Sequence, residues 1–236
     1  MSEVDVDWGE RGLARLLTRA EAVAIVDVLS FSTCISVAAD RGVTVYPVAT
    51  GDDGIALAER LGARLAKRHR DAGPADTSLS PASLLRLPPG GSLVLPSPNG
   101  SALSAIAARI PEVAVFAGCL RNRSAVAAAL GAFRRIGIVA AGERWADHSL
   151  RPAIEDWLGA GGIVDALEGA TLTAEAEFAR TAYRAARPDL MRLMHDSLSG
   201  RELADELHAG DVDVAAELDG SDRVARLVDG AYRPLP

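Results

Sequence analysis

Residues 22–33 read AVAIVDVLSFST, an unbroken apolar run that leads into a polar turn. A run without polar alternation is typical of a strand buried on both faces, as the strands of parallel sheets are. Similar β-branched runs recur along the chain and alternate with longer Ala- and Leu-rich segments of helical spacing. This alternation predicts an α/β fold, with a parallel sheet and crossover helices.

The pattern also places the individual elements. It predicts buried strands at residues 22–29, 43–48, 92–96, 113–117 and 136–140, and weaker strands at 64–68 and 223–228. It predicts helices at 33–39, 52–61, 101–109, 124–133, 153–167 and 173–186, with shorter ones toward residue 218. The segment 71–91 is rich in Pro, Gly and Ser, which interrupt strands. Because the alternation continues on both sides of it, we expect one domain over 1–236 with an irregular loop at about 71–91.

Composition excludes several classes of protein. Of the 236 residues, 49% are hydrophobic, which is enough for a proper core. The 25 basic and 32 acidic residues give 25 − 32 = −7, which argues against nucleic acid as a partner. Two cysteines, Cys34 and Cys119, are too few for a disulfide scaffold. Neither an export signal nor an apolar stretch of ~20 residues is visible, so we expect a cytoplasmic protein without a membrane partner.

The first candidate site follows the strand at 22–29. Ligands of open α/β sheets bind where strands end and helices begin. Asp27 lies late in this strand, and Ser30, Ser32 and Thr33 form the turn that opens the next helix. Hydroxyls and free N–H groups at a helix start suit an anion, although Ser32 or Thr33 is equally well explained as a helix cap.

Two further junctions have the same polar character. Asn99, Gly100 and Ser101 follow the strand at 92–96, and structure alone explains them as a turn and a cap. Arg121 and Asn122 stand just before the helix at 124–133. Acidic side chains are the usual preference at a helix start, so a cation there favours an anion site, with a solvated surface arginine as the alternative. Together these turns favour a phosphate or carboxylate site.

The junction after the strand at 136–140 is the most informative. Glu143 and Arg144 follow the strand, and the next helix begins with the adjacent acids Glu155 and Asp156. Acids in the first turn are ordinary helix-start features. Together with Asp27, however, they supply the oxygen ligands that Mg²⁺ prefers, and the metal would neutralise phosphate charge or activate water.

Other phosphate chemistries do not fit the spacing. Neither cysteine is followed by Arg at the sixth position, as a cysteine-dependent phosphatase requires. Leu29 stands where a haloacid-dehalogenase-type enzyme would have a second Asp after Asp27. No Walker loop and no GxGxxG fingerprint occurs.

Several blocks resemble one family. They include SPNGSALSAIA at 97–107, FAGCLRNRSAVAAAL at 116–130 and AAGERWADHSLRPAIEDWLGAGGIVDAL at 140–167. In this order the blocks resemble those of the ComB family, the 2-phosphosulfolactate phosphatases, over about residues 20–230. The resemblance implies a Mg²⁺-dependent phosphatase that hydrolyses 2-phospho-3-sulfolactate to 3-sulfolactate and phosphate, a step toward coenzyme M. It also implies a three-layer α/β/α fold with a mostly parallel mixed sheet.

The residues and this resemblance together give the expected site. We expect Mg²⁺ on Asp27, Glu155 and Asp156, and catalytic roles for Asp27, Glu143 and Arg144. We expect the small anionic phosphorylated metabolite to be bound by Ser30, Ser32, Thr33, Asn99, Gly100, Ser101, Arg121 and Asn122.

One departure leaves an alternative open. Ser30 and Phe31 stand where many members of the family have Arg and Ala, which removes a cation from the first turn. The chain is therefore also compatible with a catalytically inactive anion-binding or regulatory protein on the same fold. Neither the general acid nor the role of Asp211 follows from the sequence, and the apolar helix around 125–130 suggests a homodimer seam.

Overall fold

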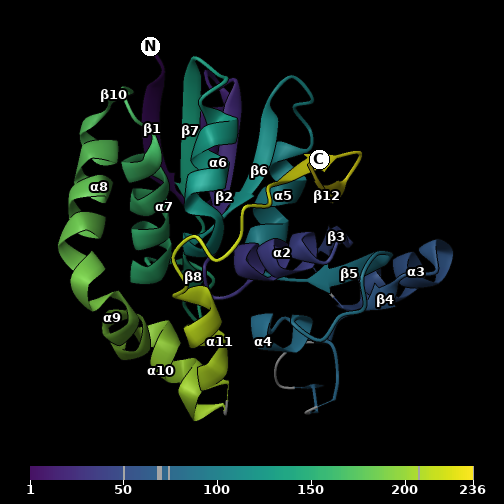
Figure 1. Ribbon diagram of the computed structural model, residues 1–236. Coiled ribbons are helices and arrows are strands. Elements are labelled where there is room, and N and C mark those ends of the chain that lie inside the picture. The colour runs from purple at the N-terminus through teal and green to yellow at the C-terminus, as the bar shows by residue number, and fades with distance from the viewer. Residues whose placement is uncertain (50, 68–70, 74, 207, 236) are drawn as a thin grey trace.

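A mixed sheet runs through the whole molecule (Figure 1). The computed structural model describes residues 1–49, 51–67, 71–73, 75–206 and 208–235. Within these ranges ten strands form one sheet, in the order β10-β1-β7-β2-β6-β11-β12-β3-β5-β4. One half of it comprises β10 (Thr171–Leu172), β1 (Glu3–Trp8), β7 (Arg135–Ala140), β2 (Ala22–Val26) and β6 (Ala114–Gly118), all parallel.

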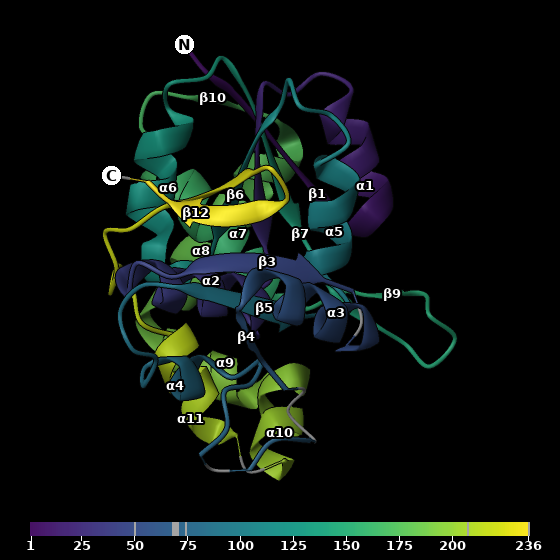
Figure 2. The same ribbon diagram turned by 90° about the vertical axis from the view of Figure 1, so that its right-hand side faces the viewer.

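The C-terminal hairpin joins the two halves of the sheet. Strand β11 (Ala225–Val228) pairs antiparallel with β6, and β12 (Ala231–Pro234) pairs antiparallel with β3 (Thr44–Val48). Beyond β3 the sheet continues in parallel through β5 (Ser92–Pro96) to β4 (Arg64–Leu65). Figure 2 shows this hairpin lying between the two sets of parallel strands. The sheet is therefore mixed and mostly parallel, as predicted.

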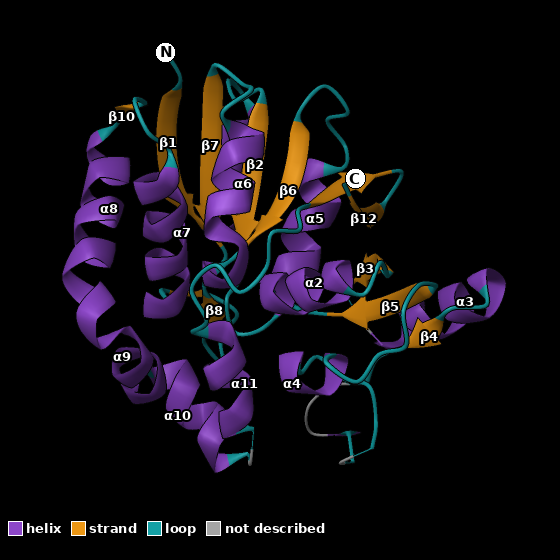
Figure 3. Ribbon diagram, in the orientation of Figure 1, coloured by secondary structure: helices purple, strands orange, loops and turns teal. Residues whose placement is uncertain are grey.

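Helices cover both faces of the first half (Figure 3). Helices α6 (Arg123–Leu130), α7 (Ile154–Ala166) and α8 (Ala174–Ala186) lie on one face, and α1 (Gly9–Leu17) and α5 (Gly100–Ala107) on the other. Alternate residues of β2 face the two layers, because successive side chains of a strand point to opposite faces. Ala24 and Val26 pack with Ile163 of α7, whereas Val23 and Ile25 join the cluster of α1 and α5. The three-layer α/β/α architecture is confirmed.

The remaining helices surround the second half and the carboxyl edge of the strands. Helix α2 (Phe31–Asp40) follows β2, and α3 (Gly51–Leu61) follows β3. Helix α4 (Pro81–Leu84) lies within the irregular segment, where Asp211 accepts hydrogen bonds from the Ser80 hydroxyl and the Ala82 N–H at 2.6 and 2.9 Å. Helices α9 (Leu190–Asp196), α10 (Leu198–Asp205) and α11 (Ala209–Ala215) lie below the sheet in Figure 1. Asp211 on α11 thus caps α4 and holds the irregular segment in place.

The predicted elements are present with small shifts at their ends. The five buried strands are β2, β3, β5, β6 and β7, and the two weaker ones are β4 and β11; residue 68 of the predicted strand 64–68 lies outside the described residues. The six predicted helices are α2, α3, α5, α6, α7 and α8. Strand β3 is only partly buried, unlike the other four. The fold class follows from patterning alone.

The first strand and helix are absent from the prediction. Strand β1 reads EVDVDW, which alternates, so it lacks the continuous apolar run used to recognise the others. Val4 and Val6 enter the core, while Asp5, only 4% exposed, is paired with Arg15 and Arg19 from the region of α1. Two ion pairs therefore make a buried aspartate tolerable in a strand that looks polar.

The apolar side chains of α6 are not on its outer face. Val126, Ala127 and Leu130 of α6 are buried in the protein's own core, so the expected exposed apolar seam at 125–130 is wrong. Those side chains face the sheet because α6 is amphipathic, and mainly alanines remain on its outer side.

Within the described ranges, no helix is long and apolar enough to cross a membrane.

Close packing of α7 on α8 generates a stability prediction. A Cβ at Gly161 of α7 would lie 2.1 Å from the carbonyl oxygen of Ala179 in α8, where neither backbone can yield without moving a helix. We expect Gly161→Ala to lower the free energy of unfolding by about 2 kcal/mol or more. Gly210→Ala in α11 is the control, because nothing lies within 4 Å of the added carbon. Urea denaturation measures both, and equal effects would contradict the packing argument.

Candidate functional site

Asp27 joins two of the strand-end turns. It follows β2 directly and is 4% exposed. Its Oδ1 accepts a hydrogen bond from the Phe31 N–H at 3.1 Å, and its Oδ2 accepts one from the Gly100 N–H at 2.9 Å. Gly100 must be glycine here, since a Cβ would lie 2.1 Å from the Phe31 ring. The β2–α2 and β5–α5 turns therefore meet at this carboxylate.

Asp156 connects α7 and the end of β7 to the turn in which Asp27 lies. It lies in the first turn of α7 and is 3% exposed. Its Oδ1 accepts from the Val28 N–H at 2.7 Å, and its Oδ2 accepts from the Gly142 N–H at 2.8 Å. Both of its oxygens are thus engaged with the backbone, one beside Asp27 and one at the end of β7. This residue fixes the position of α7 against the carboxyl ends of β2 and β7.

Glu155 and Arg151 bring the C-terminal helices to the cluster. Arg151 lies in β9 (Leu150–Arg151) and donates from its two Nη atoms to both carboxylate oxygens of Glu202 in α10, at 3.0 and 2.8 Å. Its Nη2 is 3.5 Å from the Ser199 hydroxyl, and its guanidinium lies 5.6 Å from the centre of the Trp145 ring. Glu155, in the first turn of α7, is 2% exposed.

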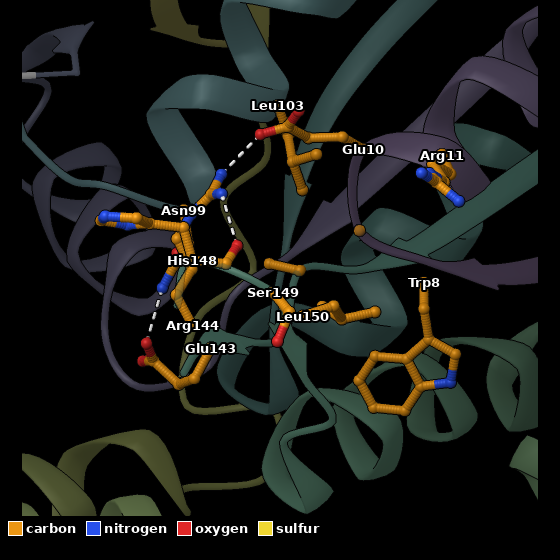
Figure 4. Close-up of a pocket in the computed structure, with 12 residues that line it drawn as sticks. Trp8, Glu10, Arg11, Asn99, Leu103, Glu143, Arg144, His148, Ser149 and Leu150 are labelled. Carbon is orange, nitrogen blue, oxygen red and sulfur yellow. Dashed lines mark hydrogen bonds and ion pairs between the residues drawn. The ribbon is translucent and has the colours of Figure 1, made fainter. Parts of the chain in front are cut away.

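Glu143 completes the cluster and faces a cavity. It lies in β8 (Glu143–Arg144), directly opposite Arg151 of the antiparallel partner β9. The Asn99 side-chain amide donates to Glu143 Oε2 at 2.8 Å, as Figure 4 shows. Both residues line a cavity of about 540 Å³. Its other lining residues are Trp8, Gly9, Glu10, Arg11, Leu103, Ala141, Arg144, His148, Ser149 and Leu150.

Burial and mutual repulsion raise the pKa values of these four acids. Burial raises the pKa of Asp27 to about 6, against two backbone hydrogen bonds that lower it, and the charge of Glu155 raises it further. Burial and the charge of Asp27 raise the pKa of Glu143 to about 7. Burial also raises the pKa values of Glu155 and Asp156. The pKa values of Glu143 and Glu155 are both lowered by the charge of Arg151.

The residues predicted from the first two turns lie around Asp27. Ser30 is the residue before α2, and the hydroxyls of Ser32 and Thr33 donate to the carbonyl oxygens of Ile25 and Val28 at 2.9 and 2.7 Å. The Ser101 hydroxyl donates to the Leu95 carbonyl at 3.4 Å. Ser32, Thr33 and Ser101 lie in the first turns of α2 and α5, whose N-cap residues are Ser30 and Asn99, so the expected caps at these three residues are wrong. Their predicted part in substrate binding stays a prediction.

The two predicted arginines lie in different places. Arg121 is buried and pairs with Asp40 at the far end of α2 and with Glu217, the latter at 2.8 Å. Asn122, next to it, accepts the Cys119 N–H at 2.9 Å. Arg144 lines the cavity and pairs with Glu10. The structure brings Asp27, Asn99, Gly100, Glu143, Glu155 and Asp156 together, whereas Arg121 is held by its own ion pairs.

The chemistry of the cluster fits a divalent cation without forming a closed cage. Among the described residues, no group of three or more His, Cys, Asp and Glu side chains is arranged to hold a metal ion. Mg²⁺ in phosphate-handling sites is commonly held by one or two carboxylates, with waters and the substrate phosphate as the other ligands. Buried acids with raised pKa values, such as Asp27 and Glu155, supply the uncompensated negative charge that such an ion needs.

Sequence reasoning missed Arg151 and much of the cavity wall. Arg151 stands four residues before Glu155, just ahead of the start of α7. A cation at that position runs against the usual preference, the same signal that drew attention to Arg121. Trp8 and Arg11 had no signal, because the strand and helix that carry them were not predicted.

The structure is an α/β protein with a cluster of buried acids at the carboxyl ends of its strands, the place where α/β proteins bind their ligands. A family model described as 2-phosphosulpholactate phosphatase matches residues 13–230. The chain belongs to that family and is a phosphoric monoester hydrolase, which confirms the resemblance found in the sequence. No curated protein gives a significant match to the chain.

The raised pKa of Glu143 predicts a pH-dependent effect on stability. The native protein retains a proton that the unfolded chain releases above about pH 4.5, so the free energy of unfolding falls as the pH rises from there to about 7. Glu143→Gln keeps an acceptor for Asn99 but does not ionise. We expect it to exceed the wild type in metal-free buffer by about 2 kcal/mol at pH 8, and by less than about 1 kcal/mol at pH 5.

Denaturant titrations at the two pH values measure this difference. The exposed Glu112→Gln serves as the matched control and is expected to change little at either pH. A Glu143→Gln effect of equal size at pH 5 and pH 8 would contradict the assignment of a raised pKa to this carboxyl group.

Proposed function

We propose that the protein is a Mg²⁺-dependent phosphatase that hydrolyses 2-phospho-3-sulfolactate to 3-sulfolactate and phosphate. The observation that carries the proposal is the meeting of Asp27, Glu143 and Glu155 beside the cavity at the carboxyl ends of the strands. The family match supports the substrate. The cavity of about 540 Å³ has room for a small phosphorylated acid.

Asp27 and Glu155 would hold the magnesium ion. When bound, the ion neutralises phosphate charge and polarises the ester. Asp156, the third predicted ligand, keeps its two backbone hydrogen bonds and orients the turns that carry Val28 and Gly142. Asp27 likewise accepts two backbone N–H groups, so in this proposal it would bind the ion through the remaining lone pairs of its oxygens.

Glu143 is the proposed proton donor. With a pKa of about 7 it holds a proton for part of the time at neutral pH, so it is able to pass one to the leaving oxygen of the ester. The Asn99 amide fixes the orientation of its carboxyl group. Arg144 lies on the cavity wall, where it attracts the anionic substrate. Water is the nucleophile, and backbone N–H groups of the strand-end turns stabilise the charge of the transition state.

Substitution of Asp27 tests the reaction centre. Asp27→Asn removes a charge and retains the shape, and we expect the rate of phosphate release from 2-phospho-3-sulfolactate to fall by about 100-fold or more. The exposed Asp222→Asn is the control and is expected to leave the rate unchanged. Full metal-dependent turnover by Asp27→Asn would overturn the assignment.

Addition of Mg²⁺ to the metal-free protein provides a second test, which measures the melting temperature instead of turnover. At pH 8 the acids of the cluster are ionised in larger part than at pH 5, so we expect added Mg²⁺ to raise the melting temperature at pH 8 and much less at pH 5. The increase is expected to disappear in Asp27→Asn. An identical rise in both proteins would place Mg²⁺ elsewhere.

The substrate itself requires a panel of phosphate esters. We expect phosphate release from 2-phospho-3-sulfolactate to exceed that from phosphate esters without a sulfonate group. If calorimetry shows tight binding of the esters but none is hydrolysed, the protein is instead the inactive anion-binding protein that the departure at Ser30 and Phe31 left open. A cytoplasmic location, a place in coenzyme M biosynthesis, a homodimer and the lack of a nucleic-acid partner stay predictions.

A further inference from the structure

A buried arginine lies beside the acidic cluster and has hydrogen-bonding capacity left over. Arg151 is 7% exposed, and Glu202 takes one N–H from each of its Nη atoms. A guanidinium has five N–H donors. The Nε of Arg151 is buried and has no hydrogen-bond partner among the described residues. A buried donor without an acceptor is costly, and such a group points to an acceptor that arrives from outside.

The placement of Arg151 relates it to the reaction centre. It stands directly across the β8–β9 pair from Glu143, and its charge also acts on Glu155. Its partner Glu202 has a side chain that is 55% exposed, so the pair is not required to satisfy a buried acid. The cation therefore has a reason to be at this place other than the neutralisation of Glu202.

The other candidate cations are less well placed. Arg121 is engaged by Asp40 and Glu217 away from the cluster. Arg144 has a side chain that is 36% exposed and pairs with Glu10 on the cavity wall. Among the arginines of the predicted site and its surroundings, Arg151 is the one whose charge acts on both Glu143 and Glu155.

We propose that Arg151 is a catalytic residue of this phosphatase, whose free Nε–H group binds an oxygen of the transferred phosphate. Glu202 and Ser199 of α10 are positioning residues that hold its guanidinium in place. Glu202 occupies the fork formed by the two Nη atoms, so the Nε–H group is the donor left for a phosphate oxygen, and the positive charge stabilises the charge that develops in the transition state. This inference rests on the proposed phosphatase function and adds a residue to its site.

Chemical rescue tests the proposal. We expect Arg151→Ala to lower kcat/KM for 2-phospho-3-sulfolactate by about 100-fold or more. Guanidinium chloride at millimolar concentration, far below the denaturing range, is expected to restore a substantial part of the rate. Arg151→Lys is expected to recover little, because an ammonium group lacks both the fork that Glu202 occupies and the Nε–H group. Arg151→Gln replaces Arg151→Ala if the alanine variant does not fold.

The matched control is a partly buried arginine whose Nε likewise has no hydrogen-bond partner among the described residues. Arg123 of α6 lies 5.5 Å from the Tyr183 ring centre and pairs with Asp219 at 2.8 Å, so it shares the cation–π contact and ion pair of Arg151. We expect Arg123→Ala to retain kcat/KM within about threefold and to be insensitive to guanidinium.

A third variant separates catalysis from anchoring. If Arg151 served only to tie α10 to β9, Glu202→Gln would lose as much activity as Arg151→Ala, and guanidinium would rescue neither; this result would overturn the proposal. We expect Glu202→Gln to lose far less.

Binding of inorganic phosphate keeps the test independent of turnover. Calorimetry is expected to show phosphate binding by the wild type that is at least tenfold weaker in Arg151→Ala and unaltered in Arg123→Ala. Unchanged phosphate affinity in Arg151→Ala would overturn the role of Arg151. A wild type that binds phosphate through Arg151 but hydrolyses none of the esters would overturn the proposed function instead.

Discussion

The constraint on which the rest of the structure depends is the burial of several carboxyl groups at one edge of the sheet. Asp27 and Asp156 accept four backbone N–H groups from three segments that are distant in the sequence. These bonds hold the turns in position, yet each one brings a negative charge into a region with little water. Burial and repulsion consequently raise the pKa values of the acids instead of lowering them. Acids with perturbed pKa values that cluster at such an edge are typical of functional sites.

Side-chain contacts tie helices α10 and α11 to β9 and to the irregular segment. Helix α10 contributes Ser199 and Glu202, and both reach the cluster through Arg151. Helix α11 contributes Asp211, which caps α4 and thereby fixes the irregular segment beside α2. Residues 198–215, which precede the last two strands of the sheet, therefore add contacts at this edge. The site is assembled from both ends of the chain, because Trp8 and Arg11 line the cavity as well.

The accuracy of prediction differs among the elements for physical reasons. Strands such as β2 and β6 are buried on both faces, so their sequences are continuous apolar runs that patterning recognises. Strand β1 is equally regular, but its Asp5 is neutralised by arginines ten and fourteen residues later, a compensation that no local pattern records. Helix α6 was predicted, but the side that faces the sheet was not, because alanines lie on both of its sides.

The sequence by itself determined the α/β class, the order of the main strands and helices, the family, and the turns that hold Asp27, Asn99 and the acids of α7. Each of these is a property of local patterning or of short motifs. Only the tertiary structure decided which polar side chains share one reaction centre. It gave the Asp156 oxygens to backbone amides, turned Arg121 toward Asp40, and set Arg151 opposite Glu143. Such choices depend on the register and packing of segments far apart in the chain, where hydrogen bonds and ion pairs compete for the same groups.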